Sequence, residues 1–139
     1  MMINYRIMDI NDYEEVYALW QSTDNIVDIE SDSKPVIQNF LERNPKTSIV
    51  AIENNKIVGI ILCGHDGRRG YIYRTAVVKS YMGQGIGREL VNQAVDALKN
   101  EGINKAAIMV FRDNKGGNAF WDKMGFDIRN EVVYRTKRL

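Results

Sequence analysis

The sequence of 139 residues has a single cysteine, Cys63, and a net charge of only +1 with histidine neutral. One cysteine excludes an internal disulfide and is typical of a reducing, cytoplasmic compartment. The small net charge argues against a general electrostatic attraction to nucleic acid or to an anionic membrane. Long hydrophobic stretches are also missing, because the longest apolar run, 57–63, is far shorter than the roughly 20 residues that span a bilayer. The N-terminus lacks the apolar segment of a signal peptide, so we expect a soluble, cytoplasmic protein without nucleic-acid or membrane partners.

The composition is typical of a folded domain. Hydrophobic residues make up 45% of the sequence and charged residues 27%, values that are ordinary for globular proteins. A chain of this length buries roughly two-thirds of its unfolded surface, which is enough for a hydrophobic core without covalent cross-links. No repeat, low-complexity segment or long linker divides the sequence, so we expect residues 1–139 to form a single domain.

Hydrophobic periodicity predicts an alternation of strands and helices in the order β-α-α-β-β-β-α-β-α-β. Asn11 followed by Glu14 resembles a capping box for the first helix, and Asn54-Asn55 is typical of a hairpin turn. The apolar run 106–111 predicts a strand that is covered on both faces. Together these patterns predict a mixed α/β domain. The expected strands are residues 3–8, 47–52, 57–63, 71–78, 106–111 and 131–136, and the expected helices are 12–21, 34–43, 86–98 and 115–124.

The segment Gly83-Gln84-Gly85-Ile86-Gly87-Arg88 lies between a predicted strand and a strongly amphipathic predicted helix. The first backbone N–H groups of a helix lack partners within it, and the helix dipole adds partial positive charge at this end. Glycines let the chain curl tightly and let a phosphate approach the backbone. Arg88 offers a further charge-assisted contact. The pattern therefore indicates a phosphate-binding loop.

Other glycine-rich loops fit this segment less well. A P-loop needs Gly-Lys-Ser/Thr, whereas Gly87 is followed by Arg88-Glu89. A dinucleotide-binding fold needs Gly-x-Gly-x-x-Gly early in a βαβ unit, whereas here the glycines follow Gly-x-Gly-x-Gly late in the chain. A turn without a ligand is the remaining alternative, although three glycines in five residues exceed what turn geometry alone requires.

Two segments resemble a known family. Residues 76–90, AVVKSYMGQGIGREL, resemble the acetyl-CoA-binding motif of the GNAT superfamily of N-acetyltransferases, Arg/Gln-x-x-Gly-x-Gly/Ala. Asn114 and the later segment 120–126, FWDKMGF, are similar to the family pattern Asn-x-x-Ala-x-x-Phe-Tyr-x-x-x-Gly-Phe. The spacing of the two segments and the predicted element order fit the family over the whole chain.

The resemblance implies an α/β fold with a mixed, splayed central β-sheet, flanked by helices on both faces, that holds the cofactor between two parting strands. It implies an enzyme that moves an acetyl group from acetyl-CoA to a primary amine by direct attack in a ternary complex, without a metal. The backbone N–H of Val77 is the expected donor to the tetrahedral oxyanion, with Val78 as the alternative. The residues expected to bind acetyl-CoA are Val77, Val78, Met82, Gly83, Gln84, Gly85, Ile86, Gly87, Arg88, Asn114 and Trp121.

Two positions depart from the family pattern. Met82 replaces the leading Arg or Gln, so the backbone amides, helped by Gln84 or Arg88, must hold the phosphates. Trp121 replaces a Tyr that is thought to protonate the departing thiolate, and an indole N–H does not release its proton near neutral pH. Acyl transfer remains feasible, because a thiolate whose conjugate acid has a pKa near ~8.5 leaves without full protonation.

The general base is open. Deprotonating a lysine-like amine at pH 7 costs roughly 4–5 kcal/mol, so a base or a water chain must take the proton. The strand expected at 71–78 has no carboxylate, where the family often has Glu. The candidates are His65, Asp66, Tyr73, an acid of the segment 22–33, or water alone.

Each candidate also has a structural interpretation. His65 is equally typical of a polar turn, and Tyr73, with Tyr71, either lines the acceptor pocket or packs against a helix. Cys63 fits a small core residue better than a nucleophile in a ping-pong reaction. Arg68-Arg69 is typical of a solvated turn.

The segment 22–33 contains four acids and no basic residue, Asp24, Asp28, Glu30 and Asp32. In the family this segment borders the acceptor site, so the acids favour a cationic small-molecule or peptide amine, or they form a solvated loop. A homodimer is compatible with the sequence. A non-catalytic acyl-CoA sensor is the alternative function, because Met82, Trp121 and the missing strand carboxylate all weaken the catalytic pattern.

Overall fold

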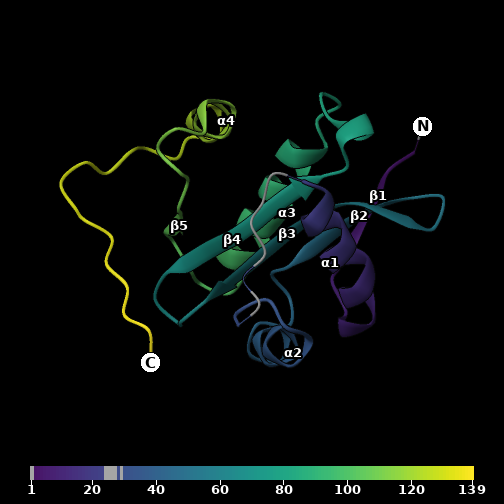
Figure 1. Cartoon of the computed structure of the whole chain (residues 1–139), viewed down its shortest axis with the longest axis horizontal. Helices are drawn as coiled ribbons and strands as arrows, with labels where there is room; N and C mark the ends of the chain where they lie inside the picture. The colour runs from purple at the N-terminus through teal and green to yellow at the C-terminus, as the bar shows by residue number, and fades with distance from the viewer. Residues whose placement is uncertain (1, 24–27, 29) are drawn as a thin grey trace. The chain divides into compact units, whose positions relative to one another are not determined.

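The computed structural model describes residues 2–23, 28 and 30–139. Their contacts divide the chain into two compact units, Met1–Met109 and Val110–Leu139. The first unit contains the sheet and helices α1 to α3, and the second contains helix α4 and the C-terminal segment (Figure 1). Each unit is described by itself below.

Within the described residues, the sheet of the first unit has five strands in the order β1-β2-β3-β4-β5. The pairs β1–β2, β2–β3 and β3–β4 are antiparallel, and β4–β5 is parallel. The mixed sheet confirms the α/β fold class. The strands are β1 (Asn4–Ile7), β2 (Ile49–Glu53), β3 (Lys56–His65), β4 (Gly70–Val77) and β5 (Ala106–Ile108).

Helices cover both faces of this sheet, as expected. Helix α3 (Ile86–Asn100) packs on one face, where the side chains of Ile86 and Leu90 lie against Gly59 of β3. Helices α1 (Tyr13–Ser22) and α2 (Lys34–Arg43) pack on the other face. Figure 1 shows α1 in front of the strands and α3 behind them.

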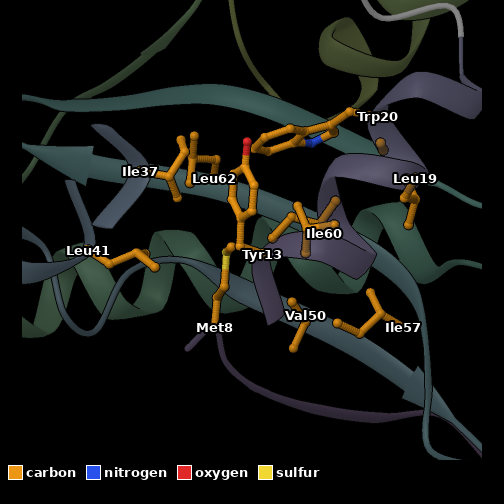
Figure 2. Close-up of a cluster of buried hydrophobic side chains, with 12 residues drawn as sticks. Met8, Tyr13, Leu19, Trp20, Ile37, Leu41, Val50, Ile57, Ile60 and Leu62 are labelled. Carbon is orange, nitrogen blue, oxygen red and sulfur yellow. The ribbon is translucent and has the colours of Figure 1, made fainter. Parts of the chain in front are cut away.

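The core between β3 and helices α1 and α2 is built around Trp20, which is fully buried. The ring of Trp20 lies close to the hydroxyl end of Tyr13 (Figure 2). Below these rings, aliphatic side chains of the sheet and of α2 complete the cluster, and burying each of them stabilises the fold by roughly 1.5–3 kcal/mol. The buried residues of this cluster are Met8, Tyr13, Val16, Leu19, Trp20, Ile37, Leu41, Val50, Ile57, Ile60, Leu62 and Ala76.

The start of α1 differs from the expectation. The capping box is formed by Asp9, which precedes a short 3-10 turn at Ile10–Asp12, and by Asp12, the last residue of that turn, and not by Asn11 and Glu14. The guanidinium of Arg6 donates to both carboxylate oxygens of Asp12 at 2.8 Å, and this hydrogen bond lowers the pKa of Asp12. The two aspartates form the capping box because their carboxylates accept from two backbone N–H groups. Asp12 also connects β1 to α1 through Arg6.

The β2–β3 hairpin confirms the predicted turn. Asn54 and Asn55 have φ of 51° and 64°, the left-handed conformation that asparagine tolerates and that a two-residue hairpin turn requires. The turn sets the register of β3, whose residues Ile57 to Cys63 are all buried.

The predicted strand 106–111 is wrong in length and in burial. β5 ends at Ile108, and the following Met109 and Phe111 are 54% and 72% exposed. A continuous apolar run suggested coverage on both faces, but such coverage requires elements packed over each face of the strand, and the run leaves the strand after Ile108.

The second unit contains α4 (Lys115–Lys123), close to the predicted helix 115–124. The predicted strand 131–136 is wrong, because no described residue after 125 belongs to a strand. Val132, Val133 and Tyr134 are each at least 65% exposed. The β-propensity of this segment is local, whereas a strand also needs a partner to receive its backbone hydrogen bonds.

Candidate functional site

The glycine loop joins the end of β4 to the start of α3 through a 3-10 turn at Lys79–Tyr81. Gly83 and Gly85 have φ of 81° and 82°, and no atom lies within 4 Å of a Cβ built on either residue. Gly85 is the N-cap of α3 and lies in the left-handed region, which disfavours other L-residues except asparagine and aspartate. The loop therefore leaves open space in front of the helix N-terminus.

The backbone N–H groups of this loop are free. Met82 N–H donates to Lys79, and Glu89 N–H is the next to find a backbone acceptor, at Gly85. Between them, the N–H groups of residues 83–88 have no partner among the residues that the structure describes. A run of free donors at the positive end of a 15-residue helix is suited to phosphate oxygens, and their binding here stays a prediction.

The side chains of the loop contribute little to a site for an anion, so the backbone N–H groups are its expected donors. Met82 is 58% exposed and offers no hydrogen bond to an anion. Gln84 and Arg88 are exposed, and no hydrogen bond or ion pair with another described residue holds their side chains. The apolar side chain of Ile86 is buried against β3 and fixes the first turn of α3.

Strands β4 and β5 pair only over the three residues of β5. Their parallel register runs only from Gly70–Ala106 to Ile72–Ile108. The remaining residues of β4, 73–77, have β3 on one side and no β5 partner on the other. β4 thus continues beyond the end of β5 with a free edge, which leads to the glycine loop, and the splay that the resemblance implied stays a prediction.

The free edge of β4 distinguishes Val77 from Val78. The N–H of Val78 donates to Val58 of β3 at 2.8 Å, and its carbonyl accepts from Tyr81 N–H at 2.8 Å. Successive N–H groups of a strand point to opposite sides, so the N–H of Val77 points away from β3. Of the two expected oxyanion donors, only Val77 keeps its N–H available.

His65 and Asp66 lie at the opposite end of β4 from Val77. His65 pairs with Gly70, and the seven residues from there to Val77 span about 20 Å of extended strand. Gly67 N–H donates to Nδ1 of His65, so the neutral ring carries its proton on Nε2, which donates to Glu101 at 3.1 Å. The Asp66 carboxylate accepts from Arg68 N–H and Arg69 N–H, which lowers its pKa. Both side chains therefore stabilise the β3–β4 turn.

Replacing His65 with alanine is expected to leave the acetylation reaction intact. Nδ1 accepts from Gly67 N–H in the turn and Nε2 donates to Glu101 at the end of α3, so the lone pair that would accept a proton is already engaged. The pH profile of kcat/KM between pH 6 and 9 should match that of the wild type within twofold. A tenfold loss of kcat together with the loss of a titration step would instead identify His65 as the base.

Cys63 is fully buried, and burial raises its pKa to about 12. Its carbonyl accepts from the hydroxyls of Thr47 and Ser48, which ties β3 to the start of β2. A thiol in this state is not a nucleophile near neutral pH, so the interpretation as a core residue is confirmed.

Tyr73 is the other side-chain candidate on β4. It lies at an irregularity in the β3–β4 register and is 49% exposed. Its ring meets Phe40 of α2 edge-on, with centroids 5.5 Å apart, and lies 6.2 Å from the ring of Tyr71. These contacts place an aromatic cluster on the α2 side of β4, and a catalytic role for Tyr73 stays a prediction.

The acidic segment 22–33 is anchored by its last acid. Asp32 is 5% exposed, and its carboxylate accepts from Arg74 of β4 and from Asp28 N–H. The guanidinium of Arg74 lies 5.1 Å from the ring centroid of Trp20. Asp32 is therefore part of the core, Asp28 and Glu30 belong to the turn beside it, and Asp24 lies outside the described residues.

Sequence reasoning missed Arg74. A single arginine between apolar residues of a strand is the signal that could have found it, because such a charge has to be paired when it is buried. Its partner could not be located from sequence, since Asp32 lies 42 positions away.

The second unit holds the other two predicted residues. The side chain of Asn114 caps α4 by accepting from Gly117 N–H at 2.9 Å. Trp121 is 8% exposed and packs edge-on against Phe120 and Phe126, with centroids 5.0 and 5.1 Å away. Both residues thus support the structure of this unit, and their roles toward the cofactor stay predictions.

Comparison with known proteins identifies the family. Residues 13–126 match the acetyltransferase (GNAT) family. The chain belongs to the GNAT family. It is 34% identical over 108 residues to N-alpha-acetyltransferase 30 of Schizosaccharomyces pombe, covering 74% of this chain and 71% of that protein. The predicted family is therefore confirmed.

Two solved structures resemble this GNAT protein. The PaiA N-acetyltransferase from Thermoplasma acidophilum, in complex with coenzyme A, has a TM-score of 0.81 at 21% identity and covers 95% of this chain and 94% of its own. A chain of the NatC complex bound to Gag peptide and CoA has a TM-score of 0.76 at 26% identity. The match covers 89% of this chain and 84% of that chain. Both support the α/β GNAT fold.

As a GNAT protein, the chain is an acetyl-CoA-dependent N-acetyltransferase. Acetyl-CoA is its acyl donor, and this confirms the predicted enzyme class and cofactor. None of the helices in the described part of the chain has the length and apolar character that crossing a lipid bilayer requires.

Proposed function

We propose that this GNAT protein acetylates the α-amine of a peptide or protein N-terminus by direct attack on acetyl-CoA in a ternary complex. The observation that carries the donor side is the run of free backbone N–H groups at residues 83–88, next to the free edge of β4. These amides would hold the pyrophosphate, with Gln84 and Arg88 at its margin. The free edge of β4 at Val77 would hold the pantetheine arm.

The proposed acceptor rests on the base candidates that the structure describes, none of which is placed to take the proton of the amine. β4 contains no carboxylate, and His65 and Asp66 are engaged about 20 Å away from Val77. An α-amine has a pKa of about 7.7–8.0, so its deprotonation at pH 7 costs only about 1 kcal/mol, against roughly 4–5 kcal/mol for lysine. Water alone can meet the smaller cost. The names of two similar proteins, an N-alpha-acetyltransferase and a peptide-bound NatC complex, support the same acceptor.

The chemistry then needs few side chains. The neutral amine attacks the thioester carbonyl, and the N–H of Val77 donates to the oxyanion that forms. The C–S bond breaks, CoA leaves as a thiolate, and the proton of the new ammonium group passes to water. Cys63 is buried with a pKa of about 12, so direct transfer is favoured over an acyl-cysteine intermediate. Tyr73 and Trp121 remain candidates to assist the proton transfers.

A comparison of different amine acceptors tests this proposal. CoA release is measured with peptides that have a free N-terminus and no lysine, with N-terminally blocked peptides that contain one lysine, and with polyamines. We expect kcat/KM at pH 7 to be at least tenfold higher for the free N-terminus. Faster turnover of blocked lysine peptides would overturn the acceptor, and tight CoA binding without turnover of any amine would favour the sensor.

The predicted cationic acceptor and homodimer remain part of this proposal. An α-amine is still largely protonated at pH 7 when it arrives, so acids near the acceptor site would attract it. Asp28 and Glu30 are the described acids of segment 22–33 that are not paired with Arg74 in the core. Asp32 is no longer a candidate for this attraction because Arg74 neutralises it.

A further inference from the structure

We propose that Glu53, at the end of β2, is a positioning residue for the acetyl-CoA loop and acts through the hydroxyl of Tyr81. This inference rests on the proposed donor site at residues 83–88 and assigns the contact that holds that loop in place. Neither residue belongs to the glycine motif, and Glu53 lies 28 positions from Tyr81.

The contact joins two turns at one end of the sheet. Tyr81 is the last residue of the 3-10 turn that precedes the glycine loop, two positions before Gly83. Its hydroxyl donates to Oε1 of Glu53 at 2.5 Å. Glu53 pairs with Lys56 at the base of the β2–β3 hairpin, whose turn is fixed by Asn54 and Asn55. The hydrogen bond to Glu53 also raises the pKa of Tyr81, so the phenol keeps the proton that it donates.

The bond to Glu53 is the last side-chain anchor before the free amides begin. Backbone bonds hold the 3-10 turn itself, through Val78 N–H to Val58 and Tyr81 N–H to Val78. Among the described residues, no hydrogen bond holds Gly83 or Gln84, and the next backbone bond runs from Glu89 N–H to the carbonyl of Gly85. A glycine segment has more conformational freedom than any other, and freedom lost on binding weakens affinity.

The position of Tyr81 therefore sets where the loop starts, while α3 sets where it ends. Fixing both ends in the unliganded protein reduces the ordering that a pyrophosphate has to impose. Fixing the loop in this way is expected to raise the affinity for acetyl-CoA. Neither Tyr81 nor Glu53 is required to touch the acetyl group or the amine.

The test compares donor affinity in a double-mutant cycle, with CoA binding measured by calorimetry and steady-state kinetics measured for both substrates. We expect Tyr81→Phe and Glu53→Ala each to raise the Kd for CoA and the KM for acetyl-CoA five- to tenfold. The kcat and the amine KM should stay within twofold of the wild type. The double variant should be no weaker than either single variant, because all three lose the same hydrogen bond.

Two controls separate positioning from general damage. Glu53→Gln keeps a carbonyl acceptor for the tyrosine hydroxyl and should retain most of the wild-type affinity. Tyr13→Phe also removes a tyrosine hydroxyl that donates a hydrogen bond, to Asp32 O at 2.7 Å, and should leave the Kd for CoA unchanged. An unchanged Kd in Tyr81→Phe, or additive losses in the double variant, would overturn the inference. Failure of the wild type to bind CoA would overturn the proposed donor site itself.

Discussion

Replacing Gly85 with aspartate is expected to raise the Kd for CoA by at least a hundredfold. Gly85 is the N-cap of α3, its φ is 82°, and a side chain there meets no atom within 4 Å. Aspartate tolerates this conformation better than most residues, so the fold should persist. Its carboxylate would occupy the space in front of the free N–H groups. At roughly 5 Å and an effective dielectric constant of about 20, repulsion of one phosphate charge costs about 3 kcal/mol.

Two variants isolate this effect. Gly85→Asn has the same shape as the aspartate variant without the charge, and its Kd for CoA should lie well below that of Gly85→Asp. Gly102→Asn makes the same change at the opposite end of α3, where φ is 81° and the added Cβ also meets nothing, and it should bind CoA normally. Equal affinities for Gly85→Asp and Gly85→Asn would show that no anion binds at this helix end.

Arg74→Met is expected to lower the free energy of unfolding by about 3 kcal/mol, because removing one partner of a buried ion pair leaves the other charge without compensation. The side chains of Arg74 and Asp32 are 13% and 7% exposed. Methionine retains much of the volume above Trp20 but leaves the Asp32 carboxylate in the core without its cation. Urea unfolding at pH 7, followed by tryptophan fluorescence, measures the loss.

The matched control removes both charges. In Arg74→Met/Asp32→Asn the asparagine side chain can still accept from Asp28 N–H, and at least half of the lost stability should return, since replacing both partners of a buried pair is often neutral. If the double variant were less stable than Arg74→Met alone, the loss would come from the packing of Arg74 on Trp20 and not from the unpaired carboxylate.

The features that the sequence could predict are those with local causes. The Asn54-Asn55 turn and the glycines at 83 and 85 are visible because each requires a residue type that tolerates positive φ at that position. The amphipathic stripe of α3 is visible because its buried residues, Ile86 to Leu98, repeat at helical spacing. The family motif lies on these same local elements, which is why the sequence alone predicts a donor site there.

The features that the sequence could not predict depend on distant partners. The pairing of Arg74 with Asp32 and of Tyr81 with Glu53 joins residues 42 and 28 positions apart. The strand predicted at 131–136 failed for the converse reason, since local β-propensity was present without a partner. The distance of His65 from Val77 likewise depends on the register of β3 and β4, which places the two residues at opposite ends of the strand.

The central claim is that the backbone N–H groups of residues 83–88 bind the pyrophosphate of acetyl-CoA. Titration of ¹⁵N-labelled protein with CoA, followed through the assigned backbone amide signals, tests it most directly. The claim predicts that the amide signals of Gly83, Gly85 and Gly87 shift in proportion to the bound fraction, as free donors acquire phosphate acceptors. Saturation with CoA while these three signals stay in place, and others elsewhere move, would contradict it.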